Sequence, residues 1–304
     1  MTRVAAIDCG TNALRLLIAD IDDSGNLVDV ARLMRTVRLG EGVDRTGEFS
    51  AAALERTFAV CAVYAQLISE HNVKRSRFVA TSASRDVSNR EKFVDGVTAR
   101  MGIAPEVIAG TEEAALSYEG ATRSLSTLIA PALVVDIGGG STEFVLGEQS
   151  VSVNIGCVRM TERHLHSDPP TDAEIALVRA DLAEAMQRAA GSVDLRSAGT
   201  LVGVAGTVTT VAARALGLDS YDPTVLHGAV IEREPLERAI ADLVAMTRAQ
   251  RAALPYMHPG RVDVIGGGAL VLGAVMDAVR LPRLTVSECD ILDGIAYRLA
   301  AETS

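Results

Sequence analysis

Short apolar runs and longer periodic segments alternate along the chain. Val4–Ile7 and Leu14–Ala19 are short apolar runs, and each predicts a buried β-strand. Between them, residues 8–12 read DCGTN, and this content of Asp, Gly and Asn is typical of a turn. The chain therefore opens with a predicted β-hairpin whose tip is polar and contains glycine.

The next segments predict two helices and a further strand. Apolar residues recur at helical spacing over Ala51–Asn72, and Ser50 is a suitable N-cap for that helix. Arg77–Ala80 predicts a buried strand. Thr111–Tyr118 predicts a helix whose first turn carries two adjacent glutamates, a favourable place for negative charge.

The opening pattern recurs in the middle of the chain. Residues 133–146 form an apolar run, a glycine-rich stretch and a second apolar run, and residues 136–143 read DIGGGSTE. Asp136 stands 128 residues after Asp8. We interpret the recurrence as an internal duplication of one supersecondary unit. The alternative is two unrelated hairpins within one α/β protein.

The remaining segments alternate strands with helices. Thr171–Ala190 predicts a helix that Thr171 and Glu174 cap together, because the two residues have the spacing of a capping box. The other predicted elements are strand Leu201–Val204, a GTVTT turn at 206–210, helix Val211–Leu216, helix Glu234–Met246, strand Val262–Ile265, a glycine tip at 266–268 and a final helix near Asp290–Ala300. Such alternation predicts α/β layers with mostly parallel sheets apart from the hairpins.

Composition and charge narrow the class. The chain has 304 residues, of which 48% are hydrophobic, so two domains are expected. A net charge of −10 argues against general nucleic-acid binding, which needs excess Lys and Arg. No apolar run approaches the ~18 residues of a membrane span, and the short apolar N-terminal run does not fit a signal peptide. We therefore expect a soluble cytoplasmic protein that binds neither nucleic acid nor membrane.

The two hairpin tips have a clear chemical use. Glycine lets the backbone approach a ligand closely, and successive N–H groups with nearby hydroxyls bind anions. A carboxylate at a strand end cannot bind phosphate itself, but it can hold Mg²⁺ that bridges phosphate oxygens. Two such tips facing each other would hold one chain of phosphates from both sides.

These motifs resemble the two phosphate loops of the exopolyphosphatase and guanosine pentaphosphate phosphohydrolase family. Other stretches are similar to that family in the same order: ATSASRD at 80–86, GTEEA at 110–114, GVAGT at 203–207 and HG at 227–228. The resemblance implies two ribonuclease-H-like lobes of the actin-like superfamily with a cleft between them. It also implies Mg²⁺-dependent removal of a terminal phosphate.

The resemblance gives the expected domains and site residues. It implies a first lobe at 1–124 and a second at 125–304, with a C-terminal helix at about 290–304 that can pack back on the first lobe. Glu113 matches the glutamate that activates water, with Glu112 as the alternative. Asp136, Glu143 and Asp8 match metal positions. The phosphate-binding positions are Asp8, Gly10, Thr11, Asn12, Arg15, Arg85, Gly138, Gly139, Gly140, Ser141, Thr142, Gly206 and Thr207.

One position departs from the family pattern. Ala13 stands where the family usually has Ser, which removes a hydroxyl donor worth about 1.5–3 kcal/mol when it binds a charged group. The expected function is an exopolyphosphatase that favours short chains of inorganic polyphosphate. Four alternatives stay open: a guanosine pentaphosphate phosphohydrolase, a weakly active or inactive regulator that binds polyphosphate or an alarmone, an actin-like ATPase, and a kinase. The glutamates at 112 and 113 could also serve only the helix dipole, and a homodimer stays open.

Overall fold

The computed structural model describes residues 1–85 and 87–302, so Asp86 of the ATSASRD stretch lies outside the described residues. The chain divides into two compact units. The first unit contains residues 1–120 and the C-terminal segment from Ile291, and the second contains Ala121–Asp290. The division thus falls at Gly120, and the C-terminal helix belongs to the first unit.

The first unit is built on a five-stranded sheet with the order β3-β2-β1-β4-β5. Its strands are β1 (Thr2–Cys9), β2 (Ala13–Ile21), β3 (Leu27–Thr36), β4 (Arg75–Ala80) and β5 (Glu106–Val107). The first three strands are antiparallel neighbours, whereas β4 runs parallel to β1 and β5 parallel to β4. The predicted opening hairpin is therefore the centre of this sheet.

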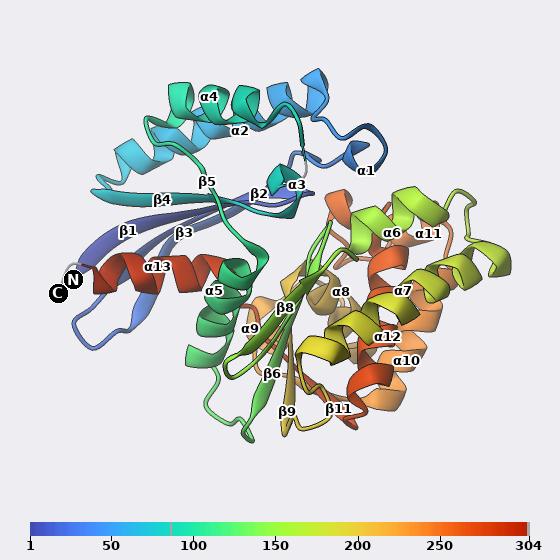
Figure 1. Cartoon of the computed structure of the whole chain (residues 1–304). Helices are drawn as coiled ribbons and strands as arrows, with labels where there is room; N and C mark the ends of the chain where they lie inside the picture. Colours follow the sequence, from blue (N-terminus) through green and yellow to red (C-terminus); the bar gives the residue numbers. More distant parts are fainter. Residues whose placement is uncertain (86, 303–304) are drawn as a thin grey trace. The chain divides into compact units, whose positions relative to one another are not determined.

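Helices cover both faces of this sheet (Figure 1). The helices that begin in this unit are α1 (Val43–Thr46), α2 (Ala51–Glu70), α3 (Ser82–Arg85), α4 (Arg90–Met101), α5 (Gly110–Arg123) and α13 (Ile291–Ala301). One apolar core includes Ile7, Leu16 and Phe93 and lies under α2 and α4. A second core includes Leu17 and Ile295 and lies on the face that α5 and α13 cover. Side chains that alternate along β1 and β2 thus point into two different cores.

Helix α2 is long and apolar enough, by length and composition alone, to cross a membrane. In the structure it is a core helix of the first unit. Ser50 caps it by accepting a hydrogen bond from the Ala53 N–H, as predicted. Leu54, Cys61 and Tyr64 are buried, and the Tyr64 hydroxyl donates to the Leu14 carbonyl at 3.0 Å. The apolar stripe of α2 is therefore used for packing on the sheet.

The second unit contains a six-stranded sheet with the order β10-β11-β9-β6-β7-β8. Its strands are β6 (Ala132–Ile137), β7 (Thr142–Leu146), β8 (Gln149–Val153), β9 (Thr200–Val204), β10 (Val230–Glu232) and β11 (Arg283–Val286). Strands β8, β7 and β6 are antiparallel neighbours, whereas β9 runs parallel to β6 and to β11. Five of these strands repeat the order and directions of the first sheet.

The helices of the second unit pack into one large core with β6 and β7. They are α6 (Cys157–His164), α7 (Asp172–Ser192), α8 (Ala205–Leu216), α9 (Pro223–Leu226), α10 (Arg233–Ala245), α11 (Arg248–Ala252), the 3-10 helix η1 (Pro259–Arg261) and α12 (Ile265–Val279). Leu133, Val135 and Phe144 point into this core. The capping box of α7 formed by Thr171 and Glu174 is present, as predicted.

The two hairpin tips have the same backbone geometry, which supports the duplication. We call residues 10–13 the first loop and residues 138–141 the second loop. In the first loop the Gly10 N–H donates to the Ala13 carbonyl at 3.0 Å. In the second loop the Gly138 N–H donates to the Ser141 carbonyl, also at 3.0 Å. The residues of each bond lie 128 positions apart in the two loops, as the two aspartates do.

Three local predictions were wrong. Val262–Ile265 is not a strand, because this short apolar run lies at the start of the buried helix α12. The three glycines at 266–268 lie inside α12 rather than in a turn, and α6 and α8 pack too closely against Gly267 and Gly268 for larger side chains. The GTVTT stretch at 206–210 also lies inside a helix, because α8 begins at Ala205.

The contact between α5 and α13 yields a stability prediction. A Cβ at Gly294 would lie 2.0 Å from the backbone oxygen of Leu116. We expect Gly294→Ala to destabilise the protein by about 1–3 kcal/mol or more, because backbone cannot move aside easily. Gly191→Ala in α7 is the matched control, since a Cβ there meets nothing within 4 Å. Gly191→Ala should stabilise the protein by up to about 1 kcal/mol. Equal urea midpoints for the two variants would contradict the prediction that backbone contact excludes a side chain at position 294.

Candidate active site

Backbone bonds from the segment after β3 hold the first loop in place. The Asn12 carbonyl accepts hydrogen bonds from the N–H groups of Val37 and Arg38 at 3.0 and 2.9 Å. The Thr11 carbonyl accepts a hydrogen bond from Gly40 at 2.8 Å, and the buried Thr11 hydroxyl shares one of 2.9 Å with Ser82. The shape of the loop is therefore fixed by its neighbours in the first unit.

Asp8 and Arg15 form a buried ion pair beside this loop. They are directly opposite each other on β1 and β2. The Oδ2 atom of Asp8 accepts hydrogen bonds from Nε and Nη2 of Arg15 at 2.9 and 2.6 Å. Asp8 is 4% exposed, so the arginine compensates a carboxylate that is removed from water. The neighbouring Cys9 thiol is inert, because burial raises its pKa well above the ordinary value.

The two glutamates at the start of α5 have different environments. Glu113 is 9% exposed, and its Oε2 accepts a hydrogen bond of 2.7 Å from Nη1 of Arg85. Glu112 has a more exposed side chain and pairs with Arg77 at 2.6 Å. Arg77 also binds Glu106. Glu113 is therefore a buried carboxylate paired with one arginine, whereas Glu112 belongs to a more exposed ion-pair network.

In the second loop, three carbonyls point toward α6. The Gly138 carbonyl accepts a hydrogen bond from the Cys157 N–H, and the Gly139 carbonyl accepts bonds from Val158 and Arg159. In a trans peptide the C=O and the following N–H point in opposite directions. The N–H groups of residues 139–141 therefore point away from α6, and within residues 1–85 and 87–302 they donate to no other group. Three such N–H groups in succession suit an anion.

Two buried carboxylates face the same side of the sheet beside the second loop. Asp136 on β6 lies directly opposite Glu143 on β7. Both are buried, and the Oε1 atom of Glu143 accepts hydrogen bonds from the hydroxyls of Ser141 and Ser152 at 2.7 and 2.6 Å. Residues opposite each other in an antiparallel pair have Cβ atoms about 4.5–5.5 Å apart, and like charges there repel. A cation between them would remove that repulsion.

These carboxylates fit a hard divalent cation. Oxygen ligands are what such an ion prefers, and Mg²⁺ commonly binds one or two carboxylates while keeping several waters. In the described part of the chain no group of three or more His, Cys, Asp or Glu side chains is gathered, here or elsewhere, so the protein would supply two carboxylates and water the other ligands. At the position equivalent to Glu143, strand β2 of the first hairpin has Arg15, so the first hairpin pairs an aspartate with an arginine where the second pairs an aspartate with a glutamate.

Helix α8 begins at the end of β9, and an arginine of η1 that the sequence did not reveal lies against its first turn. The Arg261 guanidinium lies over Gly206, where a Cβ would be 2.4 Å from its central carbon. Its Nη1 donates to the Thr210 hydroxyl at 3.1 Å. A cation at a helix N-terminus is electrostatically unfavourable unless an anion joins it. The Thr207 hydroxyl contacts the buried Cys157 thiol, so it points into the protein.

The side chain of Thr142 does not point to the same face of the sheet as Asp136 and Glu143. Its buried hydroxyl donates to the Ile155 carbonyl at 2.8 Å. Thr142 lies opposite Ile137, so it points to the opposite face of the sheet from Asp136. Its side chain therefore serves packing on that face, and we leave it out of the proposed contacts.

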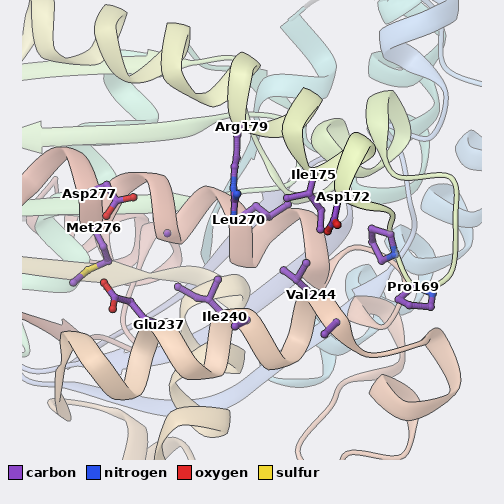
Figure 2. Close-up of a pocket in the computed structure, with 14 residues that line it drawn as sticks. Pro169, Asp172, Ile175, Arg179, Glu237, Ile240, Val244, Leu270, Met276 and Asp277 are labelled. Carbon is purple, nitrogen blue, oxygen red and sulfur yellow. The ribbon is translucent and has the colours of Figure 1, made fainter.

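A groove of about 550 Å³ lies elsewhere on the second unit, between α7, α10 and α12 (Figure 2). Its lining is mainly apolar and includes Ile175, Ile240 and Leu270. None of the site residues predicted from the sequence lines this groove. The two hairpin loops, rather than this groove, are therefore the candidate catalytic centre.

The two matching sheets and their matching hairpin loops define an α/β protein made of two related units. The chain belongs to the Ppx/GppA phosphatase family, whose model matches residues 17–303. It is 50% identical to Exopolyphosphatase 2 of Mycobacterium tuberculosis over 99% of both chains. The family and fold predicted from the sequence are thereby confirmed.

Solved structures give the same result. An exopolyphosphatase-like protein is 43% identical, and it superposes over 100% of both chains with a TM-score of 0.95. The Ppx/GppA family member of Aquifex aeolicus is 30% identical over 100% of this chain and 99% of its own, with a TM-score of 0.82. The roles of individual site residues stay predictions.

Proposed function

We propose that the protein is an exopolyphosphatase that hydrolyses the terminal phosphate of inorganic polyphosphate with Mg²⁺. Its full-length similarity to a curated exopolyphosphatase at 50% identity is the observation that carries the proposal. The local geometry supports it, because the second loop presents glycine-rich backbone with successive N–H groups, and Arg15 lies beside the first loop.

Each group has a task in the proposed reaction. The N–H groups of the second loop bind oxygens of the terminal phosphoryl group, and Arg15 and Arg261 add positive charge. Glu113 orients the attacking water and accepts its proton, while the hydrogen bond from Arg85 holds that carboxylate in place. Mg²⁺, held by Asp136 and Glu143, would neutralise charge on the phosphate oxygens. The products are orthophosphate and a chain one unit shorter.

An assay of the purified protein tests the proposal. Phosphate release should be measured with Mg²⁺ on polyphosphates of graded length, on guanosine pentaphosphate and on ATP. We expect release from polyphosphate at the highest kcat/KM. Preference for guanosine pentaphosphate would favour the second activity in the family name, and ATP as sole substrate would contradict the proposal. The same series tests the expected preference for short chains.

Ala13 gives a gain-of-function prediction. Its counterpart in the second loop is Ser141, whose hydroxyl donates to a carboxylate. In the first hairpin, Arg15 stands at the position of Glu143, and arginine cannot accept a hydrogen bond. A hydroxyl at position 13 would therefore be free to donate to an anionic ligand. We expect Ala13→Ser to lower the KM for polyphosphate by up to about tenfold. Ala13→Val adds bulk without a donor and is the control, and equal KM values for both variants would contradict the prediction.

We further propose that the protein works in the cytoplasm. All four cysteines, which lie in the described part of the chain, are free thiols, and three of them are buried. Structural disulfides are typical of oxidising compartments, so free cysteines are consistent with a reducing one.

A further inference from the structure

The second loop is held by an arginine that no functional assignment above includes. Arg159 lies in the first turn of α6 and is partly buried. Its Nε donates to the Gly140 carbonyl at 2.8 Å, and its own N–H donates to the Gly139 carbonyl at 3.1 Å. One residue thus fixes two consecutive peptide groups of the loop.

Neighbouring residues of α6 also bind the backbone of the second loop. The Cys157 N–H donates to the Gly138 carbonyl at 3.0 Å, and the Val158 N–H donates to the Gly139 carbonyl at 2.9 Å. Gly156 comes so close that a Cβ there would lie 2.5 Å from the Gly139 carbonyl. Backbone bonds orient the first two peptides, whereas among residues 1–85 and 87–302 the Gly140 carbonyl is bound by the Arg159 side chain alone.

We propose that Arg159 is a positioning residue: by binding the Gly140 carbonyl, it directs the following Ser141 N–H and its neighbours toward the phosphate. The inference rests on the proposed function, in which these N–H groups bind the terminal phosphoryl group. The physical reason is peptide planarity. A carbonyl held toward α6 forces the N–H of the same peptide to the opposite side. Without the arginine, that peptide can rotate and present its oxygen to an anion.

The first loop achieves the same end by a different route. Its Asn12 carbonyl is bound by the N–H groups of Val37 and Arg38, and Nε of Arg56 on α2 holds the Val37 carbonyl at 2.8 Å. The arginine there acts on the bracing segment rather than on the loop. In the second unit, by contrast, the Arg159 side chain binds the loop backbone directly.

Three variants test the proposal. Arg159→Met keeps length and removes the donors, and Arg159→Lys retains charge and one donor group. Arg163→Met is the matched control, because Arg163 lies one turn later on α6 and pairs with Asp181 on α7, away from the loop. For each variant we would measure kcat and KM on polyphosphate, the melting temperature, and amide hydrogen exchange of residues 157–159.

We expect Arg159→Met to lower kcat/KM by about 10- to 100-fold, since small misplacements of catalytic groups have effects of this size. KM should rise and kcat should fall, and amide exchange at residues 157–159 should accelerate. Arg159→Lys should recover part of the activity. Arg163→Met should leave amide exchange and KM near their wild-type values. We expect the two methionine variants to lower the melting temperature by similar amounts.

Equal amide-exchange rates and equal KM values for Arg159→Met and Arg163→Met would overturn the positioning role. If Arg159→Met does not fold, Arg159→Lys with a wild-type KM and wild-type exchange would overturn it equally. A wild-type protein that releases no phosphate would instead refute the proposed function, and the exchange rates at residues 157–159 would still decide whether Arg159 holds the loop.

Discussion

Glu113→Gln is expected to lower kcat for polyphosphate by about 10²–10⁴-fold, the usual contribution of a positioned general base. The amide keeps the size of the side chain and can still contact Arg85, so the fold and substrate binding should persist. Kinetics of phosphate release, together with calorimetric titration of tripolyphosphate, would separate loss of rate from loss of binding.

Glu112→Gln is the matched control for this variant. Glu112 is adjacent in sequence, but it pairs with Arg77 at the surface. Exposed ion pairs contribute about 0–1 kcal/mol, so this change should alter kcat a few-fold at most. Wild-type turnover in Glu113→Gln would remove Glu113 from the mechanism. A large loss in Glu112→Gln alone would assign the base to that residue instead.

Asp136→Asn is expected to raise the Mg²⁺ concentration needed for half-maximal activity and to lower kcat/KM by roughly 10²-fold or more, because a bound metal stabilises transition-state charge by several kcal/mol. Removing one of two facing carboxylates also relieves repulsion with Glu143, so stability should not fall. The measurements are a Mg²⁺ titration of phosphate release, with EDTA as the zero point, and thermal unfolding.

The duplication supplies a control at the equivalent position of the first hairpin. Asp8→Asn breaks a buried ion pair and leaves the Arg15 charge uncompensated, which typically costs about 3–5 kcal/mol. It should therefore lower the melting temperature while leaving the Mg²⁺ dependence of the remaining activity unchanged. A shift in Mg²⁺ requirement equal to that of Asp136→Asn would place the metal at Asp8 as well.

The hairpins were predictable because their signals are local. Two apolar runs separated by Asp and Gly specify strand, tip and strand within about a dozen residues, and the recurrence 128 residues later showed the duplication. The N-cap Ser50 and the capping box at Thr171 were equally local. The edge strand β3 was missed, because its charged residues alternate irregularly with apolar ones on a half-exposed surface.

The electrostatics of the site could not be read from the sequence. Arg85 and Glu113 are 28 residues apart and meet only because the fold brings the end of α3 to the start of α5. Arg261 reaches Gly206 across 55 positions of sequence, and nothing in its local pattern distinguishes it from a surface arginine. Burial likewise separates Glu113 from Glu112, although a helix dipole favours both.

Hydrolysis of a polyphosphate of defined length in H₂¹⁸O tests the central claim most directly. If water activated by Glu113 attacks the terminal phosphorus, each released orthophosphate carries one ¹⁸O and the shortened chain carries none. Mass spectrometry of both products at early times reads this out. The account predicts label in orthophosphate alone, and label at the end of the remaining chain would contradict it.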